Sequence, residues 1–171
     1  MLRHAWVVLL LLTFAAAQVG QADQAFADPL LDNLVGNWSL NGKVRGRDAA
    51  HDVTVEWVLH HQFLRIHERD PKQPPAANGP LPYEAIVFVG YDNQNKRYVI
   101  HWMDIFGGQF SEPVGHGTRS GDSITFTFDY ADGPFHTIFT WQPSAHTWHW
   151  HMEQQKAGTW QTFADMTLTK R

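Results

Sequence analysis

The sequence predicts an all-β fold, an antiparallel up-and-down barrel of about ten strands that follows a short N-terminal helix. Apolar and polar residues alternate along most of the chain, which is the period of a strand and not of a helix. Turn-forming residues separate these segments at intervals of roughly a dozen residues, the spacing of antiparallel sandwiches and barrels. Consecutive strands leave two open edges unless their sheet closes, so we favour a barrel.

Residues 1–27 have the features of a secretory signal peptide. A positive charge near the start precedes an apolar run at Trp6–Leu12, which is too short to cross a bilayer as a helix. Small side chains place the cleavage site after Ala22 or after Ala27. The sequence therefore predicts a periplasmic or secreted barrel domain over 28–171. No second long apolar run follows, so we expect no transmembrane segment in the mature chain.

The composition argues against several classes of function. The chain has no cysteine, which removes disulfides, thiol nucleophiles and thiolate metal sites. Its 13 Lys and Arg against 17 Asp and Glu give a net charge of −4, and no basic block offers a surface for nucleic acid. Serine-nucleophile, phosphate-loop and zinc-protease motifs are missing, and Gly107 and Gly108 follow a strand without opening a helix. The sequence predicts no catalytic residue and no cofactor.

The expected elements begin at Asp28. This residue can cap one or two helical turns at 29–34, because proline suits the first helical position and Gly36 ends the run. The strands that follow are expected at 36–46, 52–60, 63–70, 83–91, 97–105, 110–119, 123–130, 135–142, 146–154 and 159–169. The one long connection, 71–82, is rich in proline and is interpreted as an extended rim loop.

Large aromatic side chains are expected to line the barrel. They occupy one face of the alternating strands, and they are Trp57, Trp102, Phe126, Phe128, Phe139, Trp141, Trp148 and Trp150. A barrel of about ten strands leaves room for a ligand unless large side chains fill it. Two interpretations stay open, a cavity for a small lipophilic molecule and a barrel filled by its own aromatic rings.

Short aromatic motifs are distributed along the whole barrel region. They include LVGNW at 34–38, VGYD at 89–92, Trp102-x-Asp104 and GTW at 158–160. With these motifs, residues 34–171 resemble the lipocalin-like, calycin-type barrel domains of unknown function in exported bacterial proteins, and more remotely nitrobindin-like and fatty-acid-binding barrels. The resemblance implies a barrel that binds something apolar, with Trp38 closing one end. It implies no catalytic residue.

Arg65 and Asp104 are the polar candidates for contact with a ligand. If the face of Phe63 points inward, the Arg65 guanidinium would bind a ligand carboxylate; otherwise Arg65 pairs with acidic neighbours on an exposed strand. Asp104 shares the face of Trp102, where it either faces the interior or caps the turn at the strand end. His101 lies in a segment that is apolar on both faces, so we expect it to be partly buried. Three roles stay open for it: a residue that only satisfies its own hydrogen bonds, a group that orients a ligand, and an axial haem ligand.

His149, His151 and Glu153 project from one face of a strand, because alternate residues point the same way. Imidazole and carboxylate groups suit zinc, iron or nickel, so these three residues form a candidate metal site. The opposite face carries Trp148 and Trp150. If the tryptophans point inward, the histidines face solvent, and we favour this interpretation.

The predicted function is that of an exported barrel that binds a small apolar or amphipathic ligand without catalysis. One alternative is a filled barrel that serves as a structural or interaction module. Residues 85–89 are apolar on both faces and need an outer cover, either the N-terminal helix or a second copy in a homodimer. The other alternative is a metal- or haem-binding barrel built on the histidines named above.

Overall fold

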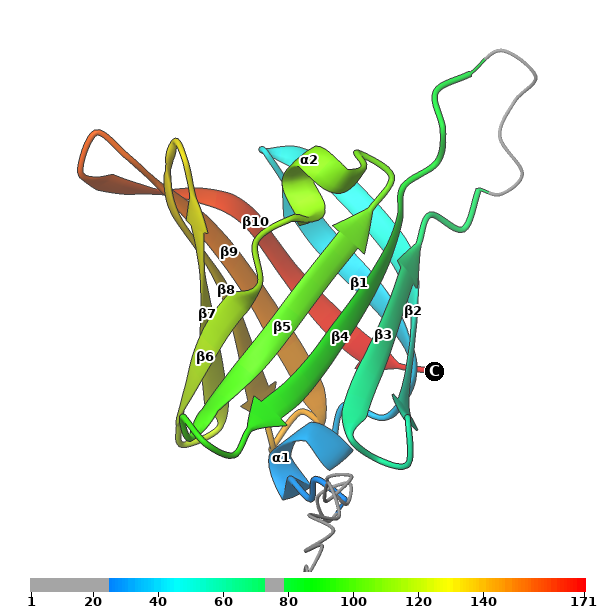
Figure 1. Cartoon of the computed structure of the whole chain (residues 1–171). Helices are drawn as coiled ribbons and strands as arrows, with labels where there is room; N and C mark the ends of the chain where they lie inside the picture. Colours follow the sequence, from blue (N-terminus) through cyan, green and yellow to red (C-terminus); the bar gives the residue numbers. More distant parts are fainter. Residues whose placement is uncertain (1–24, 73–78) are drawn as a thin grey trace, which may run out of the picture.

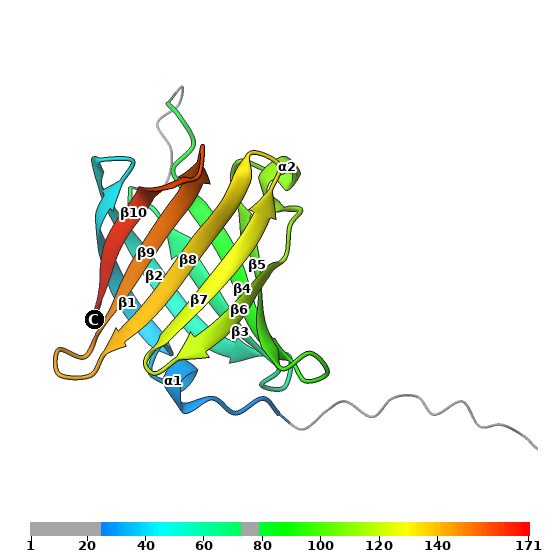
Figure 2. The same ribbon diagram turned by 90° about the vertical axis from the view of Figure 1, so that its left-hand side faces the viewer.

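The computed structural model is a closed barrel of ten antiparallel strands, as Figures 1 and 2 show. It describes residues 25–72 and 79–171. Each strand pairs with its neighbours in the sequence, and β1 (Gly36–Val44) pairs with β10 (Thr159–Lys170) to close the sheet. The register of this closing pair runs from Trp38 opposite Lys170 to Val44 opposite Ala164. The predicted fold class is therefore confirmed.

The strands between β1 and β10 are joined mostly by short hairpins. They are β2 (Arg47–Val58), β3 (Phe63–Arg69), β4 (Glu84–Asp92), β5 (Arg97–Asp104), β6 (Gly115–Ser120), β7 (Ser123–Tyr130), β8 (Gly133–Gln142) and β9 (Thr147–Lys156). β2 begins five residues before its expected start at 52, because the register of the β1–β2 hairpin continues to Val44 opposite Arg47.

The helix α1 (Pro29–Asp32) closes one end of the barrel, as Figures 1 and 2 show. The Asp28 carboxylate caps it by accepting hydrogen bonds from the backbone N–H of Leu30 at 2.8 Å and of Leu31 at 3.3 Å. Both leucines are buried in the barrel core. The short N-terminal helix lies where the sequence predicts it, and it acts as a plug. Neither helix in the described part of the chain has the length and apolar character needed to span a bilayer.

Aromatic rings pack the half of the barrel next to α1. Trp38 is buried there, as the resemblance implies, and its Nε1 donates to the Leu34 carbonyl oxygen at 2.7 Å. The rings of Phe126 and Phe139 contact each other with centroids 5.6 Å apart, and Phe139 stacks on Trp150 at 4.6 Å. Side chains from different strands thus interdigitate in this half and leave it dry.

The chain between β5 and β6 differs from the prediction. A strand was expected at 110–119, whereas the structure has one helical turn, α2 (Gly108–Ser111), and β6 begins only at Gly115. The expectation that Gly107 and Gly108 open no helix is wrong. Gly107 adopts a φ of +84°, which glycine tolerates and which turns the chain out of β5 into the helical turn. The expected rim loop at 71–82 lies partly outside the described residues.

The segment before α1 is attached to the β2–β3 hairpin. The backbone N–H of Phe26 donates to the His61 carbonyl oxygen at 3.1 Å, and His61 Nδ1 lies 2.7 Å from the Phe26 carbonyl oxygen. The Phe26 ring stacks on Tyr91 with centroids 5.4 Å apart. The hairpin holds Leu59, His60 and His61 at positive φ. Such backbone conformations need support from neighbouring structure, and Phe26 contacts the last of the three residues.

We predict that Gly117→Ala destabilises the barrel by about 1–3 kcal/mol, the usual range for overpacking a core. A Cβ atom at Gly117 would lie 2.6 Å from Cδ1 of Phe126, so the ring would have to move. Gly108→Ala is the matched control, because no atom lies within 4 Å of the added carbon there. Urea denaturation of both variants measures the effect. Equal midpoints for Gly117→Ala and the unchanged protein would show that the interior is loosely packed.

Candidate functional site

The inward-facing side chains change from buried to partly exposed along the barrel. On β5, Tyr98 and Ile100 near α1 are buried, whereas Trp102 and Asp104 are partly exposed. On β9, Trp148 and Trp150 are 0% exposed, whereas Met152 is partly exposed. The end of the barrel opposite α1 is therefore the end at which inward-facing side chains are accessible to solvent.

We call this open end the mouth. The residues that define it continue the inward-facing alternation of their strands and are partly or fully buried. They are Ala49, His51, Glu68, Tyr83, Trp102, Asp104, Tyr130, Phe135 and Met152. Contacts across the interior show that such side chains point inward. The rings of Trp102 on β5 and Trp150 on β9 lie 6.4 Å apart, although these strands are not neighbours in the sheet.

A hydrogen-bonded pair of a histidine and a glutamate lies on the β2–β3 side of the mouth. Nδ1 of His51 donates to Oε1 of Glu68 at 2.5 Å. Glu68 is 5% exposed, and its carboxylate is the most deeply buried acidic group of the mouth. Because a buried carboxylate is costly without a partner, His51 allows Glu68 to remain there.

Tyr83 connects this pair to the aromatic side of the mouth. Its ring stacks on His51 with centroids 5.2 Å apart, and its hydroxyl accepts a hydrogen bond from Trp102 Nε1 at 3.3 Å. Burial raises the pKa of Tyr83 far above the usual range, and the charges of Glu68 and Asp104 raise it further. The phenol therefore stays protonated and can donate a hydrogen bond.

Asp104 stands at the end of β5, on the interior face and beside the turn. One carboxylate oxygen accepts from the backbone N–H of Phe106 at 3.0 Å, as expected of a turn cap. Burial raises the pKa of Asp104 above its ordinary value of 3.8. Asp104 thus has both of the roles that the sequence left open, because it also faces the partly exposed interior.

Two indole groups inside the barrel lack hydrogen-bond partners. Nε1 of Trp148 and Nε1 of Trp150 are buried and make no hydrogen bond among the described residues. Buried donors are normally paired, so each needs an acceptor. Trp150 contacts Trp102 of the mouth, but its side chain is 0% exposed, so protein encloses its Nε1.

Exposed apolar side chains form part of the rim of the mouth. Phe106 is 64% exposed and Phe110, on α2, is 53% exposed. The Phe106 ring lies 6.3 Å from Tyr83, and the Tyr130 hydroxyl donates to the Phe110 carbonyl oxygen at 3.2 Å. An apolar molecule would therefore meet apolar surface before it reaches the interior.

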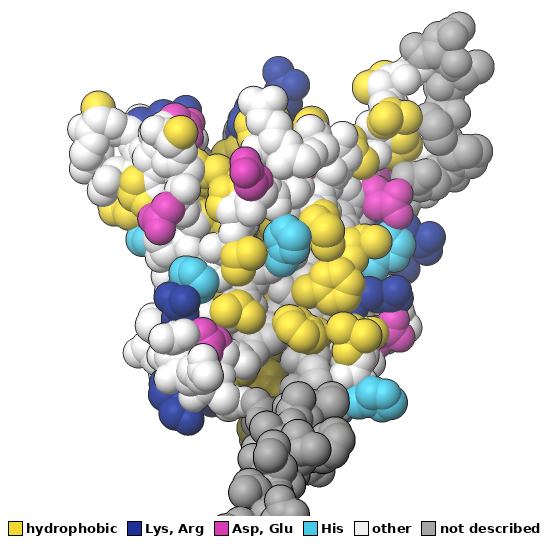
Figure 3. Space-filling view, in the orientation of Figure 1, with side chains coloured by type: hydrophobic (Ala, Val, Ile, Leu, Met, Phe, Trp, Pro, Cys, Tyr) yellow, Lys and Arg dark blue, Asp and Glu magenta, His cyan; other side chains and the backbone are white. Residues whose placement is uncertain are grey.

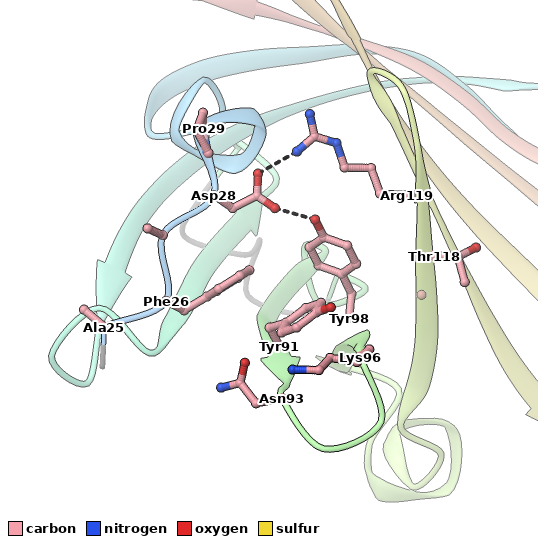
Figure 4. A pocket seen from close by; sticks show the side chains of 12 residues that line it. Ala25, Phe26, Asp28, Pro29, Tyr91, Asn93, Lys96, Tyr98, Thr118 and Arg119 are labelled. Carbon is pink, nitrogen blue, oxygen red and sulfur yellow. Dashed lines mark hydrogen bonds and ion pairs between the residues drawn. The ribbon is translucent and has the colours of Figure 1, made fainter. Parts of the chain in front are cut away.

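A hollow lies at the α1 end, between the segment before α1 and the strands β4, β5 and β6, with a volume of about 1090 Å³ (Figure 4). Its centre is Asp28, whose carboxylate accepts hydrogen bonds from Tyr98 and, at 3.1 Å, from Arg119 as well as from the α1 backbone. Burial and the Asp28 charge raise the pKa of Tyr98 to about 12, so the phenol remains a donor. Oδ1 accepts three of these hydrogen bonds and Oδ2 accepts one, all from within the protein, so we assign this carboxylate a structural role.

The comparison with family models matches residues 28–170 to the family described as "Protein of unknown function (DUF1579)". The chain belongs to the DUF1579 family. A comparison with curated proteins found no match. The site of this DUF1579 domain must therefore be argued from its own side chains.

The aromatic residues expected inside the DUF1579 domain fall into two groups. Phe126, Phe128, Phe139, Trp148 and Trp150 are buried, and Trp102 alone of the expected set belongs to the mouth. Trp57 lies at the α1 end, where its Nε1 donates to Asp32 at 2.9 Å, and Trp141 contacts Trp148 with ring centroids 5.5 Å apart. The rings thus fill one half of the interior and leave the other half partly open.

Two polar candidates lie on the outer surface of the barrel. Arg65 forms an ion pair with Glu56, because Leu64 and Ile66 take the inward positions on β3. His101 lies between the inward-facing Ile100 and Trp102, and its Nε2 is 2.7 Å from the Ser111 carbonyl oxygen. Of the alternatives that the sequence left open, Arg65 takes the exposed and paired one and does not face the interior, and His101 takes the partly buried, hydrogen-bonded one.

The three metal candidates also face outward, because Trp148 and Trp150 occupy the inward positions of β9. His149 and His151 contact the Asp165 carboxylate at 3.1 and 3.2 Å, and the His149 hydrogen bond lowers the pKa of Asp165. Glu153 pairs with His136 at 3.0 Å. In the described ranges, no three histidine or acidic side chains converge in a geometry that could hold a metal ion.

The apolar outer face of β4 is not covered by α1, which lies across the barrel end. Ile86 is 36% exposed, and Figure 3 shows apolar side chains gathered over the face where β4 and β5 lie in Figure 1. The homodimer expected through this face stays a prediction.

Sequence reasoning missed most of the polar groups of the mouth. The alternation that places Val53 and Val55 inside also places His51 inside, two residues before them. In the same way, the alternation that places Leu64 and Ile66 inside also places Glu68 inside, two residues after Ile66. The alternation of strand side chains, extended from the apolar residues to the polar ones next to them, was therefore sufficient to predict that His51 and Glu68 face inward.

We predict that Asp104→Asn stabilises the folded protein at neutral pH. The raised pKa means that the folded state holds this proton more tightly than the unfolded chain, so ionisation lowers stability as the pH rises. The asparagine keeps an acceptor for Phe106 and removes the charge. Urea denaturation should show a gain at neutral pH that disappears in acid, with the exposed Asp129→Asn as the control. A loss of stability at neutral pH would contradict the prediction.

Proposed function

We propose that this DUF1579 domain binds a small apolar or amphipathic molecule inside the mouth of the barrel. One observation carries the proposal: aromatic and apolar side chains that face inward at the mouth, such as Trp102, Phe135 and Met152, remain partly exposed, whereas most of those in the other half are buried. Exposing such side chains to water is unfavourable, and an apolar ligand would remove them from it.

The chemistry of the mouth fits a ligand site. Such sites are mostly apolar, with a few polar groups that orient the bound molecule. Trp102, Phe135 and Met152 supply apolar surface, while the Tyr83 hydroxyl and the Glu68 carboxylate supply a donor and an acceptor. The packed half beneath them, closed by α1, sets the depth that a ligand can reach.

We further propose that the domain is lipocalin-like and acts after export. The closed antiparallel barrel with a helix at one end supports the first statement. The second rests on the signal-like N-terminus, and the position of Phe26 favours cleavage after Ala22 over cleavage after Ala27. Cleavage after Ala27 would remove the contacts of Phe26 with His61 and Tyr91.

Ligand binding is tested with Nile red, an apolar dye whose fluorescence rises in apolar surroundings. We expect the mature protein to bind it and Ala49→Phe to weaken binding by about tenfold or more, because the ring would fill the mouth. Ala49 faces inward on β2 and Ala50 faces solvent, so Ala50→Phe is the matched control. Equal binding by both variants would place the dye outside the barrel and contradict the proposal.

Processing is tested by expressing the full chain with its leader and determining the N-terminus of the exported product. We expect a start at Asp23. A start at Asp28 would overturn the assignment, since Phe26 would then be absent from the mature protein. A product that is neither cleaved nor exported would contradict the proposed location.

A further inference from the structure

We propose that the ligand of the mouth is a cationic amphiphile, an amine or quaternary ammonium group on an apolar chain. This inference rests on the proposed function and adds the chemical class of the ligand. The cationic group would lie near Glu68 and Asp104, and the apolar chain would lie against Trp102 and Met152.

The acidic side chains of the mouth favour a cationic ligand. Glu68 is 5% exposed and Asp104 is partly exposed, and both face the interior. Among the described residues, no hydrogen bond or ion pair joins either carboxylate to a lysine or an arginine; their partners are His51 and the backbone of Phe106. Negative charge in a partly enclosed space attracts a cation more strongly than charge in open water.

Aromatic rings adjoin these carboxylates. Tyr83 is close enough to Glu68 and Asp104 for their charges to act on its hydroxyl, and Trp102 donates its Nε1 to the same hydroxyl. A cation near the face of such rings gains a further electrostatic attraction, and rings combined with carboxylates are the surroundings in which ammonium groups bind.

Trp150 marks the depth that the apolar chain can reach. The residue is 0% exposed, so protein covers its ring on every side. Its ring contacts Trp102 with centroids 6.4 Å apart. The chain would therefore lie against the partly exposed Trp102 and end above Trp150.

The basic groups near the mouth argue against an anionic ligand. Arg45, in the β1–β2 turn, lies over the Phe163 ring at 4.8 Å and is exposed. Arg65 faces the outside of the barrel, paired with Glu56. An anion could meet Arg45 at the rim, but it would then have to approach the more deeply placed carboxylates.

The test compares three amphiphiles that share a dodecyl chain, each below its critical micelle concentration. They are dodecyltrimethylammonium, dodecyldimethylamine oxide, which is uncharged at neutral pH, and dodecanoate. Calorimetric titration of the mature protein at low salt should give the ammonium an affinity about tenfold higher than the amine oxide, with dodecanoate weakest. Asp104→Asn and Glu68→Gln should reduce the ratio of ammonium to amine oxide affinity by several fold.

Two controls separate this inference from non-specific attraction. Asp129→Asn removes an exposed charge outside the barrel and should leave the ratio unchanged. Ala49→Phe should weaken all three amphiphiles together. If the advantage of the ammonium compound persists in Ala49→Phe, it arises at the surface and the inference is wrong.

The remaining outcomes distinguish the inference from the function on which it rests. Equal affinity for the three compounds, or tighter binding of dodecanoate, overturns the cationic assignment and leaves the binding function in place. Absence of binding to every amphiphile and to Nile red overturns the proposed function and the inference with it.

Discussion

A closed ten-strand barrel encloses more space than ordinary aliphatic side chains can fill, since eight strands already leave an interior just wide enough to pack. The rest of this structure follows from that constraint. Next to α1, the space is filled by large rings, including Trp38, Phe126 and Trp148, with glycines on β6 making room for them. Towards the mouth the same filling is incomplete, and polar groups replace aliphatic ones.

The polar groups at the two ends of the barrel differ in how many hydrogen-bond partners they have. At the α1 end, Asp28 receives hydrogen bonds from the helix backbone, Tyr98 and Arg119, so its charge is balanced within the protein. At the mouth, Glu68 and Asp104 have few partners among the described residues, namely His51 and the backbone of Phe106. Balanced groups stabilise a fold, whereas groups with spare hydrogen-bonding capacity are available to a ligand.

Alternation with a period of two was enough to predict the barrel, because each strand buries one face. It also contained the inward positions of His51 and Glu68, which no sequence motif marks. The sequence could not show which face of β3 is inward, so it left Arg65 between a ligand carboxylate and an acidic neighbour on the outer surface. It could not show α2 either, since a single helical turn after Gly107 depends on one backbone angle and leaves no periodic pattern.

The central claim is that the mouth is an interior site for an apolar chain, and a crystal structure of the mature protein soaked with dodecyldimethylamine oxide tests it most directly. We expect electron density for the alkyl chain inside the barrel, against Trp102 and Met152. Density confined to the outer face of β4 and β5, with the side chains of the mouth packed against one another, would contradict the claim.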